Sequence, residues 1–129
     1  MNTPNPAIIL IENDDVTLEL YQRELCKSFS VFAFTEIEGV LDVIGNQDIR
    51  AVIIEPEINS GKGSELIHLL YSTFPDRSIP VIICSTRDSG QPDCTGEVTR
   101  YLTKPVLPRT LREKTLEVIS EKEKLERSS

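Results

Sequence analysis

Short, uninterrupted apolar runs constrain the fold of this chain more than any other feature. AIILI at 7–11, AVIIE at 51–55 and IPVIICS at 79–85 are too short for typical helices and are rich in β-branched residues. Two weaker runs, SVFAF at 30–34 and RYLT at 100–103, complete a set of five predicted strands. Because the strongest runs are apolar at nearly every position, we expect strands that are covered on both faces, as in a parallel sheet.

Amphipathic segments between these runs predict the first two helices. Asp14 or Asp15 can cap a helix through VTLELYQRELCKSF, which follows the first strand. Thr35 and Glu38 have the spacing of a capping box, so we expect them to open a helix through GVLDVIG. The Gly-Asn pair at 45–46 is its predicted C-terminal stop.

Two further helices are predicted in the second half of the chain. SELIHLLYSTF at 64–74 predicts a third helix that ends at Pro75, and a last helix is expected to start near Pro108. The apolar face of the last helix consists of Leu111, Thr115, Val118 and Ile119. The charged segment 120–129 is typical of a solvated helix end or a linker.

Strands that alternate with helices imply βαβ units, and so a five-stranded parallel sheet with helices on both faces. We expect one domain over 1–129, with its core at about 7–119. The carboxyl ends of parallel strands meet at one edge, where open α/β folds bind ligands. The polar positions at these ends are Glu12-Asn13-Asp14, Glu55, Ser85 and Lys104.

Composition excludes several classes of function. Fourteen Lys and Arg against 21 Asp and Glu give a net charge of −7, which argues against a nucleic-acid surface. Cys26, Cys84 and Cys94 form no CxxC pair, and the single His68 has no ligand partner at zinc spacing. There is no basic n-region and no apolar run of membrane-spanning length, so we expect a cytosolic protein without a membrane segment.

The order of the polar positions resembles that of a response-regulator receiver domain, over about residues 7–119. Acidic residues follow the first strand, a carboxylate ends the third, a hydroxyl ends the fourth and Lys-Pro follows the fifth. The resemblance implies a flavodoxin-like, doubly wound fold. In that family an aspartate at the end of the third strand accepts a phosphoryl group from a histidine kinase, and nearby acidic residues hold Mg²⁺.

Carried over to this chain, the resemblance gives Glu55 the phosphoacceptor position, with Ser85 and Lys104 as the residues that contact the phosphoryl group. It implies a signalling switch formed by Ser85 and Tyr101, although an aromatic residue in a short edge strand is also typical of half-buried packing. It also implies a cis Lys104–Pro105 peptide bond. The metal positions are Glu12, Asn13, Glu55 and the main-chain carbonyl of Glu57.

Two departures from the family pattern affect the same reaction. Glutamate replaces aspartate at position 55, and its longer side chain places the carboxylate where a phosphoryl group or metal would lie; a displacement of about 1 Å can cost on the order of 10²-fold in rate. Asn13 removes a negative charge from the metal site, so we expect no cofactor and weak Mg²⁺ binding at best. Gly90, Pro92 and Gly96 oppose a helix in the link from 86 to 101, so the fourth helix of the family is expected to be degenerate or missing.

These observations predict an atypical receiver, or pseudo-receiver. It would not be an enzyme but a protein-interaction module in a two-component-type pathway. A histidine kinase or an output protein would contact the 86–101 loop and the last helix. Glu55 would either mimic the phosphorylated state or be a relic that pairs with Lys104. The alternatives are an ordinary phosphoryl-accepting receiver that uses Mg²⁺ and a kinase, and a structural or homodimerisation domain that pairs through its last helix.

Overall fold

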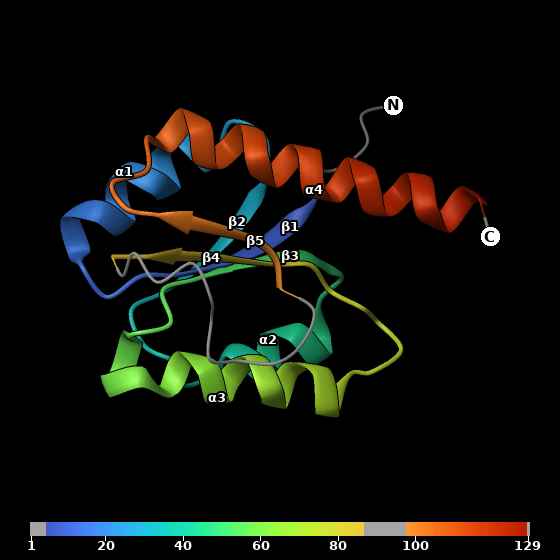
Figure 1. Cartoon of the computed structure of the whole chain (residues 1–129), viewed down its shortest axis with the longest axis horizontal. Coiled ribbons are helices and arrows are strands. Elements are labelled where there is room, and N and C mark those ends of the chain that lie inside the picture. Colours follow the sequence, from blue (N-terminus) through green and yellow to red (C-terminus); the bar gives the residue numbers. More distant parts are fainter. Residues whose placement is uncertain (1–4, 87–97, 129) are drawn as a thin grey trace.

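The computed structural model describes residues 5–86 and 98–128, which contain five strands and four helices (Figure 1). In chain order they are β1 (Ala7–Ile11), α1 (Asp15–Leu25), β2 (Ser30–Phe34), α2 (Val40–Asn46), β3 (Ile49–Ile54), α3 (Ile58–Thr73), β4 (Val81–Ser85), β5 (Val98–Thr103) and α4 (Pro108–Ser128). The predicted alternation of strands and helices is confirmed across the described part of the chain.

The strands form one parallel sheet in the order β2-β1-β3-β4-β5. Figure 1 shows α1 and α4 on one face of the sheet and α2 and α3 on the other. This is the doubly wound, flavodoxin-like arrangement that the sequence predicts. The strand order reverses direction at β1, and ligands of such folds bind outside the carboxyl ends of the strands at this switch point.

The core consists of two apolar layers, one on each face of the sheet. Along β1, Ile9 and Ile11 pack toward α2 and α3, whereas Ile8 and Leu10 pack toward α1 and α4. Successive side chains of a strand point to opposite faces, so a strand covered on both sides has to be apolar throughout. Each fully buried isoleucine contributes about 1.5–3 kcal/mol through the hydrophobic effect, and this explains why the strand sequences are so uniform.

The last helix packs through the face that its sequence predicts. Leu111, Thr115, Val118 and Ile119 are all buried, and the Thr115 hydroxyl donates to the Leu111 carbonyl at 2.7 Å. The helix continues to Ser128, and in Figure 1 its last turns run past the end of the sheet. Leu125 in this part is 72% exposed.

The predicted capping box at Thr35 and Glu38 is wrong. The helix starts at Val40, and its N-cap is Gly39, which makes no side-chain capping hydrogen bond. Gly39 has a φ of 84°, a left-handed conformation that glycine adopts without steric cost, and this turn delays the helix beyond the two capping residues. The helix ends at Asn46, within the predicted Gly-Asn stop. A Cβ on Gly45 would contact the Phe74 ring at 3.6 Å.

Two helix boundaries also differ from the prediction. The first helix ends at Leu25 rather than near Phe29, because residues 26–28 form a turn that brings Phe29 into the core. The third helix begins at Ile58 instead of Ser64, in spite of two glycines in its first turns. Gly63 permits this, since a Cβ there would lie 2.7 Å from Pro56 Cα and would exclude the preceding loop.

Three strands begin two residues away from the predicted position: β3 begins at Ile49 rather than at residue 51, β4 at Val81 rather than at residue 79, and β5 at Val98 rather than at residue 100. The prediction that the family's fourth helix is degenerate or missing concerns the link between β4 and β5, not α4. Residues 87–97 of that link lie outside the described residues. No helix in 5–86 or 98–128 is both long and apolar enough to cross a membrane.

Candidate functional site

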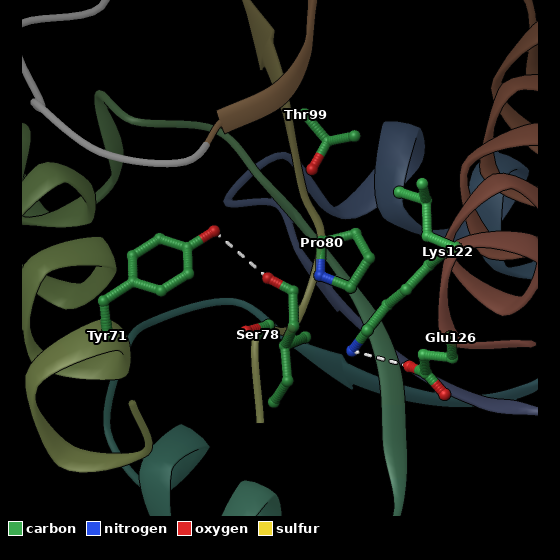
Figure 2. Close-up of a pocket in the computed structure, with 8 residues that line it drawn as sticks. Tyr71, Ser78, Pro80, Thr99, Lys122 and Glu126 are labelled. Carbon is green, nitrogen blue, oxygen red and sulfur yellow. Dashed lines mark hydrogen bonds and ion pairs between the residues drawn. The ribbon is translucent and has the colours of Figure 1, made fainter. Parts of the chain in front are cut away.

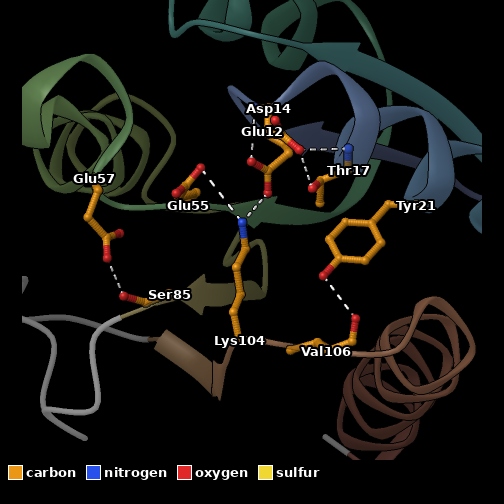
Figure 3. Close-up of polar contacts among 9 residues, drawn as sticks. All are labelled: Glu12, Asp14, Thr17, Tyr21, Glu55, Glu57, Ser85, Lys104 and Val106. Atoms are coloured by element: carbon orange, nitrogen blue, oxygen red, sulfur yellow. Dashed lines mark hydrogen bonds and ion pairs between the residues drawn. The ribbon is translucent and has the colours of Figure 1, made fainter.

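The polar residues predicted to meet at the carboxyl edge of the sheet do meet there (Figure 3). Glu12 follows β1, Glu55 follows β3, Ser85 ends β4 and Lys104 follows β5. Main-chain hydrogen bonds hold the two acidic residues in line with the sheet: Glu12 N–H donates to the Phe34 carbonyl at 3.0 Å, and Glu55 N–H donates to the Ile11 carbonyl at 3.2 Å. Glu12, Glu55 and Ser85 are 2%, 9% and 0% exposed, so the site is polar and yet buried.

Lys104 is the basic centre of the site. Its amine forms a short ion pair with Glu12 Oε1 and a longer one with Glu55 Oε2, at 3.8 Å. The predicted pairing of Lys104 with Glu55 is therefore present, but Glu12 is the closer partner. Because β1 lies beside β3, both carboxylates are within reach of one amine.

The main chain around Lys104 is held from two sides. Its N–H donates to the Ser85 carbonyl at 2.7 Å, and the Lys104–Pro105 peptide bond is cis, as the resemblance implies. The Tyr21 hydroxyl of α1 donates to the Val106 carbonyl at 3.0 Å, and burial of this phenol raises the pKa of Tyr21 to about 12. The loop that carries Lys104 is thus attached to β4 and to α1.

Glu55 has a strongly shifted pKa. Burial and the neighbouring Glu12 carboxyl raise the pKa of Glu55 to about 7, while Lys104 and a hydrogen bond from the Asn13 main-chain N–H oppose the rise. Two carboxylates that share one lysine in a buried site cannot both ionise at their ordinary pKa values. A substantial fraction of Glu55 is therefore protonated near neutral pH.

The acidic segment after β1 divides its residues between the site and the next helix. The Asp14 carboxylate accepts the Thr17 N–H at 3.0 Å as the N-cap of α1, and hydrogen bonds from Thr17 lower the pKa of Asp14. The Asp14 N–H donates to Glu12 Oε2 at 3.1 Å. Asn13 is exposed, so its contribution to Glu55 comes from the main chain.

Glu57 contributes a side chain that the sequence reasoning missed. The resemblance assigns it only a main-chain carbonyl, yet the Ser85 hydroxyl donates to Glu57 Oε1. Figure 3 shows Glu57 extending from the turn before α3 toward the end of β4. The available signal was a second glutamate two residues after Glu55, in a loop that has to pass the neighbouring strand end. Glu57 Oε2 and Glu55 Oε2 are buried and have no hydrogen-bond partner among the residues that the structure describes.

Tyr101 lies in β5 opposite Ile83 of β4, and it is half-buried against the core layer on the α2 and α3 face. This position agrees with both roles that were considered, packing and switching. It places Tyr101 two residues before Thr103, which pairs with Ser85. A connection between Ser85 and Tyr101 would therefore run through the β4–β5 ladder.

The residues at the predicted metal positions do not fit Mg²⁺ in this arrangement. Mg²⁺ requires several oxygen ligands around one point, and here the Lys104 amine contacts both Glu12 and Glu55. That amine pairs with two of the carboxylates that a cation would need as ligands. Within 5–86 and 98–128, no group of three or more His, Cys, Asp or Glu side chains is arranged to hold a metal ion.

Two cavities deserve comparison with this site. One of about 390 Å³ adjoins it and is lined by Thr17, Leu20, Tyr21 and Lys104 among others. The other, of about 360 Å³, lies near the start of β4 between α3 and α4, where the Tyr71 hydroxyl donates to the Ile79 carbonyl at 3.1 Å (Figure 2). The second cavity contains none of the predicted site residues, so the candidate chemistry stays at the carboxyl edge.

Comparison with solved structures identifies the class of fold. The chain superposes on a CheY-like response regulator receiver domain protein from Methanospirillum hungatei JF-1 with a TM-score of 0.78 and 21% identity, covering 93% of this chain and 98% of that one. A receiver domain protein from Clostridium thermocellum gives 0.78 and 21%, over 93% and 98%. The receiver domain of Francisella response regulator 1452 gives 0.79 and 19%, over 92% and 99%.

Sequence comparison adds nothing to this result. No family model matches the chain, and no curated protein matches it significantly. At these identities the structural likeness shows a shared fold, that of CheY-like receiver domains, over almost the whole chain. The function of the site has to be inferred from its residues.

Proposed function

We propose that the chain is an atypical receiver domain that signals through protein contacts in a two-component-type pathway, without phosphorylation at residue 55. One observation carries the proposal. In this chain, which has a receiver fold, the residue at the acceptor position is Glu55, a buried glutamate that shares Lys104 with Glu12. Lys104 is already paired with Glu12 and Glu55, and the Ser85 hydroxyl already donates to Glu57.

The condition of Glu55 opposes phosphoryl transfer. A nucleophilic carboxylate has to be ionised and placed in line with the incoming phosphorus, within about 3–3.5 Å. The pKa of Glu55 is raised to about 7, so near neutrality a large fraction carries a proton. The additional methylene of glutamate also moves the carboxylate away from the position that an aspartate would occupy.

The charge around Glu55 opposes the metal that such a transfer uses. Asn13 supplies no carboxylate, and the Lys104 amine contacts the two that remain. We therefore propose that the domain is not an enzyme and has no resident cofactor. The pseudo-receiver character follows from two losses, the aspartate acceptor at position 55 and the carboxylate at position 13, because both oppose phosphoryl transfer.

The partner is proposed to be a protein, either a histidine kinase or an output protein. The described residues that offer apolar contacts on the last helix are Leu116 and Leu125, which are 40% and 72% exposed. Around them α4 is rich in both acidic and basic residues. The net charge of −7 argues that this domain itself does not bind nucleic acid.

Acetyl phosphate with Mg²⁺ and intact-mass spectrometry test the proposal. The wild-type chain is expected to remain unmodified at concentrations that label ordinary receivers. The double variant Glu55→Asp with Asn13→Asp is expected to gain Mg²⁺ binding, because it restores both the shorter acceptor and the missing charge. Glu65→Asp is the matched control, since Glu65 is exposed on α3 and undergoes the same change of side chain. Stoichiometric labelling of the wild type at Glu55 would overturn the proposal in favour of an ordinary receiver.

A further inference from the structure

The acidic residues of the site fall into two separate groups (Figure 3). Glu12 and Glu55 contact Lys104, whereas Glu57 contacts Ser85. The carboxylate that accepts the Ser85 hydroxyl is therefore that of Glu57, which comes from the loop between β3 and α3.

The contact between Glu57 and Ser85 joins two distant segments at a partly buried point. Ser85 is 0% exposed, and 28 residues separate it from Glu57. A hydroxyl that donates to a carboxylate forms a bond about twice as strong as a bond between neutral groups. Burial strengthens it further, because water does not compete for the hydroxyl.

We propose that Glu57 is a built-in acid group that keeps Ser85 engaged and so sets the ends of β4 and β5 in one signalling state. This inference rests on the proposed function. It assigns to Glu57 the contact with Ser85 that a phosphoryl group on residue 55 would otherwise make. The proposal concerns the hydrogen bond itself and requires no ligand, metal or covalent step.

The path from Ser85 to the outer strand is continuous. Ser85 pairs with Thr103 in the β4–β5 ladder, and its carbonyl accepts the Lys104 N–H at 2.7 Å. Tyr101 lies two residues earlier on the same strand, opposite Ile83. Any reorientation of Ser85 is therefore felt first at Thr103 and Lys104 and then along the edge strand that a partner would meet.

The loop that carries Glu57 is positioned independently of this hydrogen bond. The Ile58 N–H donates to the Glu55 carbonyl at 3.2 Å, and Gly63 of α3 packs directly against Pro56. Ile58 itself is buried. A variant that removes only the Glu57 carboxylate should thus keep the loop in place, so that its effect reports on Ser85.

The test compares amide NMR spectra and hydrogen exchange of the whole chain for four variants. Glu57→Ala and Ser85→Ala each remove the hydrogen bond from one side, and Glu57→Gln keeps an acceptor while it removes the charge. Glu65→Ala is the control, an exposed glutamate on the helix that follows Glu57. We expect Glu57→Ala and Ser85→Ala to shift the same amides at 85, 103 and 104, and to accelerate exchange of the Lys104 amide on the order of tenfold. Glu57→Gln should shift these amides much less.

Several results would overturn the inference. Shifts of Glu57→Ala that stay within residues 55–60, or that differ in pattern from those of Ser85→Ala, would mean that the bond does not set the strand ends. Equal effects of Glu57→Gln and Glu57→Ala would assign the change to charge. Failure here leaves the wild type unlabelled by acetyl phosphate, whereas failure of the proposed function shows as labelling, so the two are distinguishable.

Discussion

The interiors of the central strands and their carboxyl ends are equally buried but are stabilised in opposite ways. Ile8, Ile9 and Ile53 are at most 1% exposed and pack within the two apolar layers of the core. Glu12 and Ser85, at the ends of the same sheet, are as buried and yet polar. In the interior, burial itself is favourable. At the ends, burial is unfavourable unless each group finds a partner.

The supply of partners at the strand ends is incomplete. Three carboxylates face one lysine and one serine hydroxyl, and an oxygen of Glu55 and one of Glu57 are without a hydrogen-bond donor among the described residues. Unsatisfied polar groups at one edge of an otherwise uniform core are typical of a functional site. The stability of this domain and its proposed signalling role therefore belong to different parts of the same strands.

The largest expected effect is a cavity in the interior. Ile53→Ala should destabilise the domain by about 3–5 kcal/mol, because it removes buried methyl groups and leaves a space that the sheet cannot close. Urea unfolding measures this as a lower midpoint with an unchanged slope. Leu69→Ala is the control: Leu69 is 48% exposed on α3, and its loss should cost under about 1 kcal/mol. Equal effects of the two variants would contradict the assignment of stability to the buried strand interiors.

The next effect concerns the lysine at the strand ends. Lys104→Met should destabilise the domain by about 2–4 kcal/mol at pH 8, since it leaves the Glu12 carboxylate buried without its cation. Protonation of the acids removes that penalty, so the loss should shrink as the pH falls toward 5. Lys114→Met on α4, where the lysine forms a 3.7 Å surface pair with Glu117, should have little effect. A pH-independent loss at Lys104 would point to packing of its aliphatic stem instead of its charge.

The smallest effect has the opposite sign. The pKa of Glu55 is raised from its ordinary value of 4.5 to about 7 in the folded chain. The protonated form is therefore favoured by folding: its stabilisation is fully present below about pH 4.5 and is lost as the pH rises through about 7. Glu55→Gln should stabilise the domain by about 1–2 kcal/mol at pH 8.

Measurements of unfolding at several pH values would check this. The gain from Glu55→Gln should disappear near pH 5, where the wild-type side chain is already neutral. Glu65→Gln on the exposed surface of α3 should show no such trend. A variant that is less stable than the wild type at pH 8 would show that the Glu55 charge is favourable, and that Lys104 outweighs Glu12.

The fold was predictable from the sequence because its strongest signal is local. The bounds of β1 and β2 agree with the predicted runs 7–11 and 30–34. In β1, which is buried along nearly its whole length, the apolar run is unbroken. Helix starts were less predictable where a glycine decides them. Gly39 delays one helix through its positive φ, and Gly63 allows another to start early against Pro56. Both effects depend on the backbone conformation at the start of the helix, which apolar periodicity does not report.

The site was predictable in its members but not in its pairings. Parallel strands bring Glu12, Glu55, Ser85 and Lys104 to one edge whatever their side-chain conformations. Which carboxylate takes the lysine and which takes the serine depends on rotamers and on the loop after β3. For that reason the short Lys104–Glu12 pair and the Glu57 side chain appear only in the structure.

Beryllofluoride tests the central claim most directly, since it reproduces a phosphoryl group at an acceptor carboxylate without a kinase. Amide spectra of the wild-type chain are recorded with Mg²⁺ alone and then with Mg²⁺ and beryllofluoride. We expect no saturable shifts at Ser85, Tyr101 or Lys104, because Glu55 shares Lys104 with Glu12 and because Glu57 already engages Ser85. Saturable, Mg²⁺-dependent shifts at these three residues would contradict it and would establish a working acceptor at Glu55.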